Sequence, residues 1–584
     1  MVVKVTAPNI QDKITTGSNA ATLINDSKRA VNQVVDVVND LPVFGDSASK
    51  DTGTAAGQVP LNSDLKRPAK YQLEFEGVSA AVAAVSANPA NYPLNTGIKT
   101  LSYRTKVECE ALAINYPDGG GADYVVVGGG TGVADGGSFL NAGSKQLKLV
   151  SNGTASVEQF GGANLVDSTQ ALQNALNSMG NVTCGPSTFI VSNFTIPTMT
   201  TLTGSGTTFK APASMAIPSD WCTNEVKPTT AIRSDKDINI SGITWDASEV
   251  IAPRWLQNPT TLAPITDPEL DYYDVSTNPN GKIGNPSFPV YDIFDAVADD
   301  RRNGGYDNGL TAIAFSKTVN PAVKDCVFIN VKGRVIIDAG CLNGVYSRNH
   351  FEECGKNDGA FHCFWVQSAG SPDNPPADFM DSENTEVSYN TANNIERSFA
   401  LFAPTKGGRI HNNTITGWGE SCIFIPHVVN INGGRTAIHH NKMYDGVLTD
   451  IAGQGIEAGG AQNLDIYGND IQRSSMQAQV LTGVGKSKVY TNSMLDCFTA
   501  ESIPYGPFSE RYAFNIGQSP IAGNALDRTT EGVVVIGTLG SYTGGGTSIT
   551  DNVITDGRAT KIGNAFKQSK TSGVSIGKDL TIKD

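Results

Sequence analysis

The amino-acid sequence predicts an all-β protein in which the chain winds into a solenoid of stacked coils. A phrase of the form apolar-x-x-Asn-x-apolar recurs between residues 346 and 554, and its copies carry the asparagines Asn349, Asn390, Asn413, Asn441, Asn469, Asn492 and Asn552. Successive asparagines are 41, 23, 28, 28, 23 and 60 residues apart. Steps of 23 and 28 residues suit one coil of a β-solenoid, whereas the longer steps leave room for a loop insertion or further coils.

The residues between these asparagines are typical of short stacked strands. Apolar β-branched residues alternate with polar ones, which turns one side of each strand towards a core. One strand alone cannot bury its apolar side, but the same strand of the next coil lies about 4.8 Å away, so a stack buries a continuous column. Asparagine tolerates the left-handed backbone angles of a turn, and its amide can bond to the asparagine one coil along. A β-sandwich is the alternative, but it would lack a fixed phrase at one-coil spacing.

Composition narrows the classes of protein. Charged residues make up 17% of the chain and hydrophobic residues 39%, which excludes disorder for most of it. The net charge of −14 disfavours a nucleic-acid partner. No apolar run reaches the ~18 residues of a membrane span, and the first residues lack the apolar segment of a secretory signal peptide. We expect no metal site or cofactor, and we expect reduced cysteines in the core at Cys326, Cys341, Cys354, Cys363 and Cys422.

Changes in composition divide the chain into four parts. Residues 1–70 contain a helical stretch with a short heptad pattern, and residues 71–155 alternate short β runs with glycine clusters. The solenoid is expected over residues 156–500, with an insertion at about 247–307 where the repeat is interrupted. The repeat weakens over residues 501–584, which are expected to form a C-terminal β region that closes the solenoid end.

Three segments carry a resemblance to a known family. VEQFGG at residues 157–162, followed by DSTQALQNAL at 167–176, resembles the opening of a β-helix. The turn DGGSF at 135–139 resembles a small module that precedes it, and DTGTAAGQVP at 51–60 resembles a phrase of N-terminal particle-binding regions. The chain therefore resembles bacteriophage tailspike proteins, which have a pectate-lyase-like, right-handed, single-stranded parallel β-helix.

The resemblance implies both an assembly and an activity. It implies a homotrimer that attaches to a virion tail, or to another tail protein, through residues 1–70 and trimerises through residues 501–584. It also implies that the protein depolymerises a bacterial surface polysaccharide, either capsule or lipopolysaccharide O-antigen. Such a protein is made in the cytoplasm of the host and acts at the bacterial cell surface, without inserting into the membrane. The family has no single catalytic motif, so the site has to be predicted from chemistry.

Glycoside hydrolysis usually needs two carboxyl groups, and adjacent coils bring outward side chains to useful distances. The required separations are about 5 Å for retention and about 6.5–9.5 Å for inversion, close to one or two coil spacings. Glu457 is the first candidate, because alternation in the sequence QGIEAG turns Ile456 inward and Glu457 outward. Asp450 and Glu420 are the expected partners. Further acids are Asp445 and Glu396 as reserves, and Asp338, expected outward but about four coils away.

Aromatic and polar residues near these acids are candidates for sugar binding, because a sugar ring stacks its apolar face on aromatic side chains. These candidates are Trp365, Trp418, His427, Arg435 and Tyr444. Core packing is an equal competitor for Trp365. The pair His439 and His440 lacks the spacing and the third ligand of a metal site.

Two other functions compete with a hydrolase. A polysaccharide lyase on the same scaffold would abstract a proton beside a uronate carboxyl, with His427, Arg435 and Tyr444 as the candidate bases. A non-catalytic adhesin would bind glycan reversibly. Unsaturated product ends distinguish the lyase, and an unchanged glycan length distinguishes the adhesin.

Overall fold

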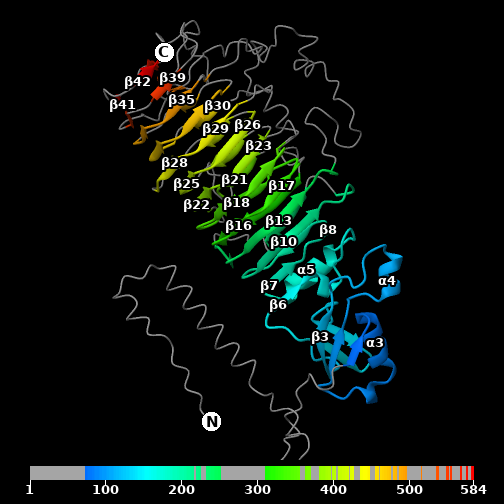
Figure 1. Cartoon of the computed structure of the whole chain (residues 1–584). Helices are drawn as coiled ribbons and strands as arrows, with labels where there is room; N and C mark the ends of the chain where they lie inside the picture. The colour runs from blue at the N-terminus through cyan, green and yellow to red at the C-terminus, as the bar shows by residue number, and fades with distance from the viewer. Residues whose placement is uncertain are drawn as a thin grey trace, which may run out of the picture. The chain divides into compact units, whose positions relative to one another are not determined.

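The computed structural model describes the chain from Leu73 to Lys583 with gaps, and the predicted parallel β-helix is confirmed (Figure 1). The described residues are 73–215, 219–224, 232–250, 310–355, 362–369, 380–395, 398–402, 405–419, 421–425, 434–446, 454–459, 461–474, 478–482, 486–495 and 497, followed by short strands between residues 514 and 583. The heptad pattern of residues 1–70, nearly all of the insertion at 247–307 and most of residues 501–584 lie outside the described residues.

Residues 73–150 form a small sheet packed against one helix. The helix α3 (Val78–Ala87) turns Val78, Ala81 and Val85 towards the sheet, and the short elements η3 (Pro89–Asn91) and α4 (Lys106–Ala111) follow. The sheet has the order β1-β2-β3-β5-β4, in which β1 and β2 are parallel and the other pairs antiparallel. Its strands are β1 (Leu73–Phe75), β2 (Gly97–Thr100), β3 (Ala122–Gly128), β4 (Phe139–Ala142) and β5 (Lys145–Leu149).

A helix covers the N-terminal end of the β-helix, at the position predicted from the sequence. After η4 (Val157–Phe160), α5 (Thr169–Ser178) buries an apolar stripe that consists of Ala171, Leu172, Ala175 and Leu176. This stripe recurs at intervals of three and four residues, as an amphipathic helix requires. The helices α3 and α5 have ten residues each, so neither is long enough to cross a bilayer, and the same holds for every other described helix.

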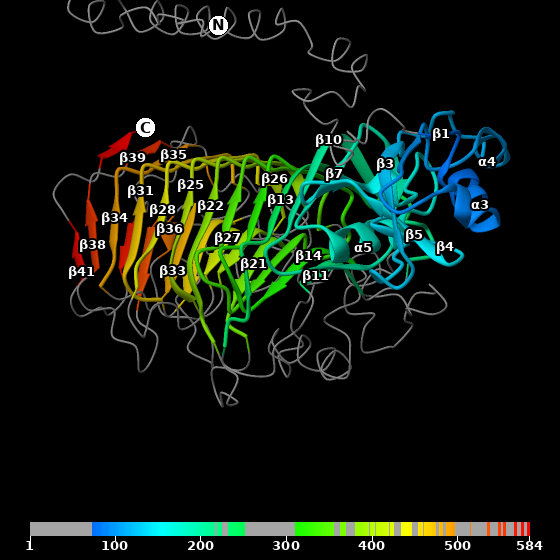
Figure 2. The same ribbon diagram turned by 90° about the horizontal axis from the view of Figure 1, so that it is seen from below.

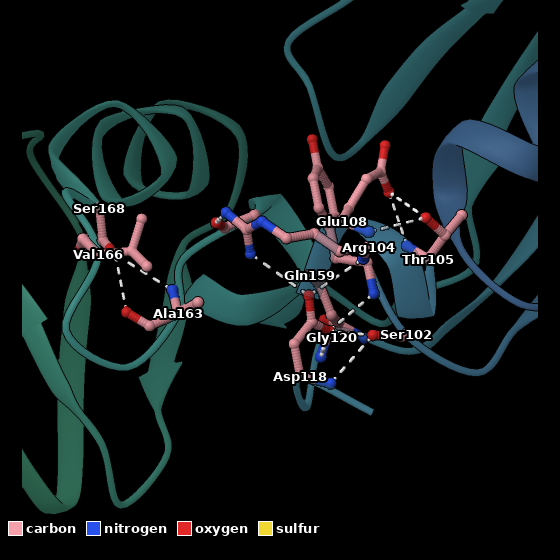
Figure 3. A network of polar contacts seen from close by, with 12 residues as sticks. Ser102, Arg104, Thr105, Glu108, Asp118, Gly120, Gln159, Ala163, Val166 and Ser168 are labelled. Carbon is pink, nitrogen blue, oxygen red and sulfur yellow. Dashed lines mark hydrogen bonds and ion pairs between the residues drawn. The ribbon is translucent and has the colours of Figure 1, made fainter. Parts of the chain in front are cut away.

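Polar contacts join the small sheet to the start of the β-helix (Figure 3). The buried carboxylate of Asp118 accepts bonds from the Ser102 hydroxyl at 2.6 Å and from the backbone N–H groups of Tyr103 and Arg104 at 2.9 and 3.0 Å. The same carboxylate pairs with the Arg104 guanidinium at 3.3 Å, and that guanidinium donates across to the Gly161 carbonyl at 2.5 Å. Residues 72–584 accordingly form one compact unit.

The β-helix consists of three parallel stacks of strands, and a coil of the central region contributes one strand to each. In one such coil β25 (Thr405–His411) belongs to the first stack, β26 (Thr414–Trp418) to the second and β27 (Ser421–Ile425) to the third. Each pairs in parallel with the equivalent strand of the next coil. Figure 2 shows the coils following one another from α5 at one end to β38 and β41 at the other.

The first and second stacks share long strands in the first coils of the β-helix. The first coils hold β6 (Thr154–Ser156), β7 (Asn181–Cys184), β8 (Thr188–Ile190), β10 (Thr201–Lys210) and β13 (Asn239–Asp246), and the last two run through both stacks. The first stack continues with β16 (Ala322–Lys324), β19 (Val345–Ser347), β22 (Ser382–Ser388), β25, β28 (Thr436–His439), β31 (Leu464–Tyr467), β34 (Lys488–Tyr490), β38 (Thr547–Thr550) and β41 (Val574–Ile576).

The second stack continues with β17 (Val327–Ile329), β20 (His350–Glu352), β23 (Thr391–Ile395), β26, β29 (Lys442–Tyr444), β32 (Asp470–Gln472), β35 (Ser493–Leu495), β39 (Val553–Thr555) and β42 (Thr581–Lys583). The third stack consists of β9 (Phe194–Ile196), β11 (Ser219–Asn224), β14 (Leu310–Ser316), β18 (Ile336–Ala339), β21 (His362–Gln367), β24 (Ser398–Phe402), β27, β30 (Gln454–Gly459), β33 (Gln479–Thr482), β36 (Phe514–Asn515), β37 (Val534–Gly537) and β40 (Phe566–Gln568). A separate pair is formed by β12 (Asp235–Lys236) and β15 (Thr318–Val319).

The recurrent asparagines form a buried ladder between the first and second stacks, as predicted. Each side-chain amide donates to the side-chain oxygen of the next asparagine, over 2.8–3.1 Å, from Asn349 through Asn390, Asn413, Asn441 and Asn469 to Asn492. The expectation that asparagine itself takes the left-handed backbone angles is wrong. The residue before it does so, with φ between 52° and 61°, at Arg348, Tyr389, Asn412, His440, Gly468 and Thr491.

The core is a set of inward columns that run along the stacks. One column consists of Val323, Tyr346, Val387, Ile410, Ile438, Ile466 and Val489, all fully buried. Aromatic rings stack in another, with centroid separations of 6.1 Å for Trp245 and Phe328 and 5.2 Å for Phe328 and Phe351. The five cysteines expected in the core are buried, as are the other four.

Candidate functional site

Glu457 lies on the outer face of the third stack, in one column with a predicted sugar-binding residue. Its neighbour Ile456 is fully buried, whereas Glu457 is part-exposed. The strand register places Glu457 opposite Phe424 of β27, Phe424 opposite Leu401 of β24, and Leu401 opposite Trp365 of β21. Three coils therefore separate Trp365 from Glu457, which is about 14 Å at 4.8 Å per coil.

A polar column runs beside this one on the same face. It consists of Arg334, His362, Ser398, Ser421 and Gln454, which are matched by the register of β18, β21, β24, β27 and β30. The His362 ring packs edge-on against Trp365 with centroids 5.1 Å apart, so residues three apart in one strand share the face. In the strand β27 the two residues between Ser421 and Phe424, namely Cys422 and Ile423, are both fully buried.

Ser421 is the centre of the contacts around Glu457. Its side chain is fully buried, and its hydroxyl lies 2.9 Å from Gln454 Oε1 and also within hydrogen-bond distance of Glu457 Oε2. The Trp418 indole N–H donates to the backbone carbonyl of Gln454 at 2.5 Å. These contacts join the coil of β27 to that of β30 and fix the start of β30. Strict alternation did not predict Ser421 or Gln454 here, because it assigns residues three apart to opposite faces.

Trp418 does not face solvent, which corrects the expectation that it binds sugar. Strict alternation from Ile415, which is buried, would turn Trp418 outward. Gly417 has φ of 70°, a left-handed angle that favours glycine, and this residue reverses the alternation. Trp418 consequently enters the core, where it is fully buried opposite Ile395.

Trp365 is part-exposed, and one face of its ring is occupied. The Arg334 guanidinium carbon lies 3.8 Å from the ring centroid, which is a cation–π contact. The indole N–H donates to Gln367 Oε1 at 2.6 Å. A sugar that approaches Trp365 would therefore meet a guanidinium beside the aromatic ring.

Arg435 and Tyr444 are not on the outer face that carries Glu457. Arg435 precedes β28 of the first stack and pairs with Asp465 of the next coil. Tyr444 belongs to β29 of the second stack, and its hydroxyl donates to Asp470 at 2.9 Å. Burial and this carboxylate raise the pKa of Tyr444 to about 12. The reserve acid Asp445 forms two bonds with Arg473, which lower its pKa.

Four predicted residues lie outside the described residues: Asp450, Glu420, His427 and Glu396. The expectation that Asp338 points outward is wrong. Asp338 is fully buried, accepts bonds from Tyr346, Ser382 and Thr385 at 2.7–3.0 Å, and has a pKa raised by burial. Val335 and Ile336 both face the core, so the alternation shifts by one residue before Asp338. It does lie four coils from the strand of Glu457, as expected.

An aromatic ladder on the first stack was not predicted. His411, His439, Tyr467 and Tyr490 stack face to face with centroid separations of 4.7, 4.7 and 4.9 Å. Each lies two residues before an asparagine of the asparagine ladder. This regular offset is the feature of the sequence from which the stacking of the four rings could have been predicted. Because the rings cover each other's faces, a sugar could stack only at the ends of the ladder.

The polar groups of the described residues offer no metal site. Among the residues described between 73 and 497, no three histidine, cysteine, aspartate or glutamate side chains are grouped closely enough to hold a metal ion. His439, a member of the aromatic ladder, contacts the neighbouring His440 through their Nδ1 atoms at 2.9 Å.

Comparison with known proteins finds similar structures but no matching family. No protein-family model and no curated sequence matches the chain. The gp42 tailspike of Acinetobacter phage vb_AbaP_AS12 is similar with a TM-score of 0.45 and 10% identity, over 87% of this chain and 74% of that one. The enzymatically active domain of tailspike protein 2 of bacteriophage CBA120 gives 0.42 and 12%, over 88% and 57%.

A family 28 exopolygalacturonase of Yersinia enterocolitica is similar with a TM-score of 0.42 and 12% identity, over 79% of this chain and 84% of that one. At such identities the similarity concerns the fold alone. The function therefore has to be argued from the side chains of this chain.

Proposed function

We propose that this protein binds a bacterial surface polysaccharide, capsule or O-antigen, and depolymerises it by endo-acting hydrolysis of glycosidic bonds. The position of Glu457 carries the proposal. Its part-exposed carboxyl lies on the outer face of β30, bonded to Ser421, in one column with Phe424 and Trp365. An acid beside aromatic side chains suits a sugar, because the ring contacts the aromatic surface while its glycosidic oxygen takes a proton.

Glu457 is assigned the role of general acid. Its proton passes to the glycosidic oxygen as the bond from that oxygen to the anomeric carbon breaks, and a second carboxylate either activates water or attacks the anomeric carbon. Asp450 and Glu420 are proposed for that second role. A partner one coil away favours retention, and a partner two coils away, at about 9.6 Å, favours inversion.

The assembly proposed for the protein follows from the resemblance of its sequence to tailspikes. We propose a homotrimer that attaches to a phage tail through residues 1–70 and trimerises through residues 501–584. The stacked coils between these parts supply a long rigid face on which a polymer can lie.

The described residues disfavour two of the candidate bases for a lyase. A base must be deprotonated near neutral pH, yet the pKa of Tyr444 is raised to about 12 and its hydroxyl is bonded to Asp470. Arg435 is held in an ion pair with Asp465. Arginine keeps its proton in proteins, so this guanidinium is a poor base.

Glu457→Gln tests the proposal, because the amide keeps the shape of the side chain and removes the acid. Release of reducing ends from the polysaccharide should fall by about 10²–10⁴-fold while glycan binding persists. Glu352→Gln, which changes an outward carboxylate of the second stack, should leave turnover unchanged. Wild-type turnover in Glu457→Gln would remove Glu457 from the site. Unsaturated product ends would show a lyase, and a polysaccharide of unchanged length would show an adhesin.

A further inference from the structure

A side-chain amide lies beside Trp365 on the outer face of the third stack. Burial alternates along β21, in which Phe364 and Val366 are buried whereas Trp365 and Gln367 are part-exposed. Trp365 and Gln367 therefore both point outward, and the indole N–H donates to Gln367 Oε1 at 2.6 Å. The two side chains form one patch that is aromatic on one side and polar on the other.

The indole N–H fixes the orientation of the Gln367 amide. An indole N–H is a donor only, so the atom that it contacts must be the amide oxygen and not the amide nitrogen. Since Oε1 lies at the indole, Nε2 lies on the other side of the amide and carries two N–H groups. The register partner of Gln367 on β18 is Ala339, whose methyl group offers these N–H groups no acceptor. Gln367 thus presents donors beside the ring.

A cation lies against the same ring. The Arg334 guanidinium carbon is 3.8 Å from the centroid of Trp365, and Arg334 is also part-exposed. A guanidinium has five N–H donors, and a carboxylate that pairs with it takes two of them, so Arg334 keeps donors for a ligand whatever else it contacts. The other ring contact of Trp365, His362, is fully buried. The part-exposed polar groups around the ring are therefore donors, and one of them carries a positive charge.

We propose that Trp365, Gln367 and Arg334 form a subsite for a sugar residue that carries a carboxylate, such as a uronic acid. The inference rests on the function proposed above and names the class of polysaccharide that the site takes. An ionised carboxylate has acceptors only, so it matches a group of donors better than a hydroxyl, which must also place its own proton. Its hydrogen bonds are about twice as strong as those of a neutral acceptor, and the guanidinium adds charge attraction.

The subsite is remote from the bond that breaks. Trp365 lies three coils from Glu457, which is about 14 Å at 4.8 Å per coil. The other described residues of this column from β18 to β27 are Ile337, Leu401 and Phe424, which carry no charge that would repel a carboxylate. Contacts this far from the reacting atoms are equally strong in the ground state and the transition state, so they lower KM and leave kcat unchanged.

The test compares two forms of one polymer on the full chain. The first is the bacterial surface polysaccharide that the wild type binds, and the second is the same polymer after carbodiimide–borohydride reduction, which converts each carboxyl to a neutral hydroxymethyl group. For the wild type, KM for the native polymer should be about 10- to 100-fold lower than KM for the reduced polymer, as expected for hydrogen bonds to a charged group. A native polymer without carboxyl groups overturns the inference.

Substitutions of Gln367 show whether this preference arises at the subsite. Gln367→Glu removes both N–H donors, keeps an oxygen for the indole and adds a negative charge. KM for the native polymer should rise by about 10- to 100-fold with kcat unchanged, whereas KM for the reduced polymer should change little. Gln367→Met removes the donors without adding charge and should shift KM in the same direction. Gln170→Glu is the matched control, because Gln170 is an exposed glutamine of α5 whose amide donates to Asn174.

Binding can also be measured without turnover in the Glu457→Gln variant. Titration calorimetry of this variant with the native polymer, with and without Gln367→Glu, should show the same fold-change in Kd as the one found in KM. Equal shifts for the native and the reduced polymer, or no shift in either Gln367 variant, would overturn the inference, because the donors would then not recognise a carboxylate. Full activity of Glu457→Gln would instead overturn the proposed function, and the comparison of the two polymers would still decide the inference.

Discussion

Trp365 and Glu457 occupy the same outward column of the third stack, three coils apart. The pairs that link them are Trp365 with Leu401, Leu401 with Phe424, and Phe424 with Glu457. At about 4.8 Å per coil this separation is about 14 Å, which is longer than one sugar ring. A ligand that contacts both side chains must therefore be an oligomer laid along the axis of the β-helix.

Replacement of Trp365 by alanine should weaken the binding of long substrates more than that of short ones. Loss of an aromatic contact of about 1–2 kcal/mol corresponds to a rise in KM of about 5- to 30-fold for the polymer. The value of kcat should change little, because Trp365 is remote from the bond that breaks. Tyr389→Ala removes an exposed aromatic side chain next to the first stack and serves as the control. An unchanged KM for the polymer would exclude Trp365 from the binding surface.

Sequence reasoning predicted the coils well because the asparagine ladder imposes one fixed spacing on them. It placed side chains poorly where the backbone departs from strict alternation. In the third stack two successive residues face the core, as Val335 and Ile336 do, and this shift buries Asp338. In the second stack a left-handed Gly417 has the same effect on Trp418. Both departures are changes of backbone conformation, and strict alternation of side chains along the strand cannot reveal them.

Asn441→Ala should destabilise the β-helix strongly. The Asn441 side chain is fully buried, accepts from the backbone and side-chain amides of Asn413, and donates to Ile410 and Asn469. Its removal leaves several buried polar groups without partners, at about 1–3 kcal/mol each, and should lower the apparent Tm by several degrees. Asn393→Ala, which loses one part-buried bond to Glu352, should have a much smaller effect. Equal losses in the two variants would contradict a structural role for the ladder.

The aromatic ladder should make stability depend on pH through His439. Burial, followed by the neighbouring His411, His440 and Arg409, lowers the pKa of His439 to about 4, against the opposing effect of Glu386. Because the folded pKa lies below the usual value near 6.5, the unfolded chain binds the proton more readily. The contribution of neutral His439 to the free energy of unfolding is therefore present in full above about pH 6.5, and it is lost as the pH falls towards 4.

His439→Tyr should reduce this acid sensitivity, since a tyrosine continues the stack formed by Tyr467 and Tyr490. Apparent Tm values between pH 7.5 and 4.5 measure the effect. The matched control is His350→Tyr, which changes a part-exposed histidine of the second stack outside the aromatic ladder. If the Tm of His439→Tyr falls with acid as steeply as that of the wild type, the ladder does not carry the pH dependence.

Truncation should show that the small sheet of residues 73–150 supports the β-helix. Arg104 bonds to Asp118 and to the Gly161 carbonyl, and Gly137 packs so closely on Phe160 that an added Cβ would lie 2.2 Å from its ring. Removal of residues 1–155 uncovers Phe160, which is now buried, so we expect a lower apparent Tm and less soluble protein. Removal of residues 1–71 follows the boundary of the compact unit and should leave both unchanged.

Single substitutions at the same junction remove individual contacts without shortening the chain. Arg104→Ala removes the bonds to Asp118 and Gly161, and because the Asp118 carboxylate is almost fully buried, the apparent Tm should fall by several degrees. Lys106→Ala changes an exposed side chain of the neighbouring helix and should have no measurable effect. If the chain without residues 1–155 unfolds at the wild-type temperature, the β-helix is capped by α5 alone. The polar contacts of Asp118 would then stabilise only the small sheet.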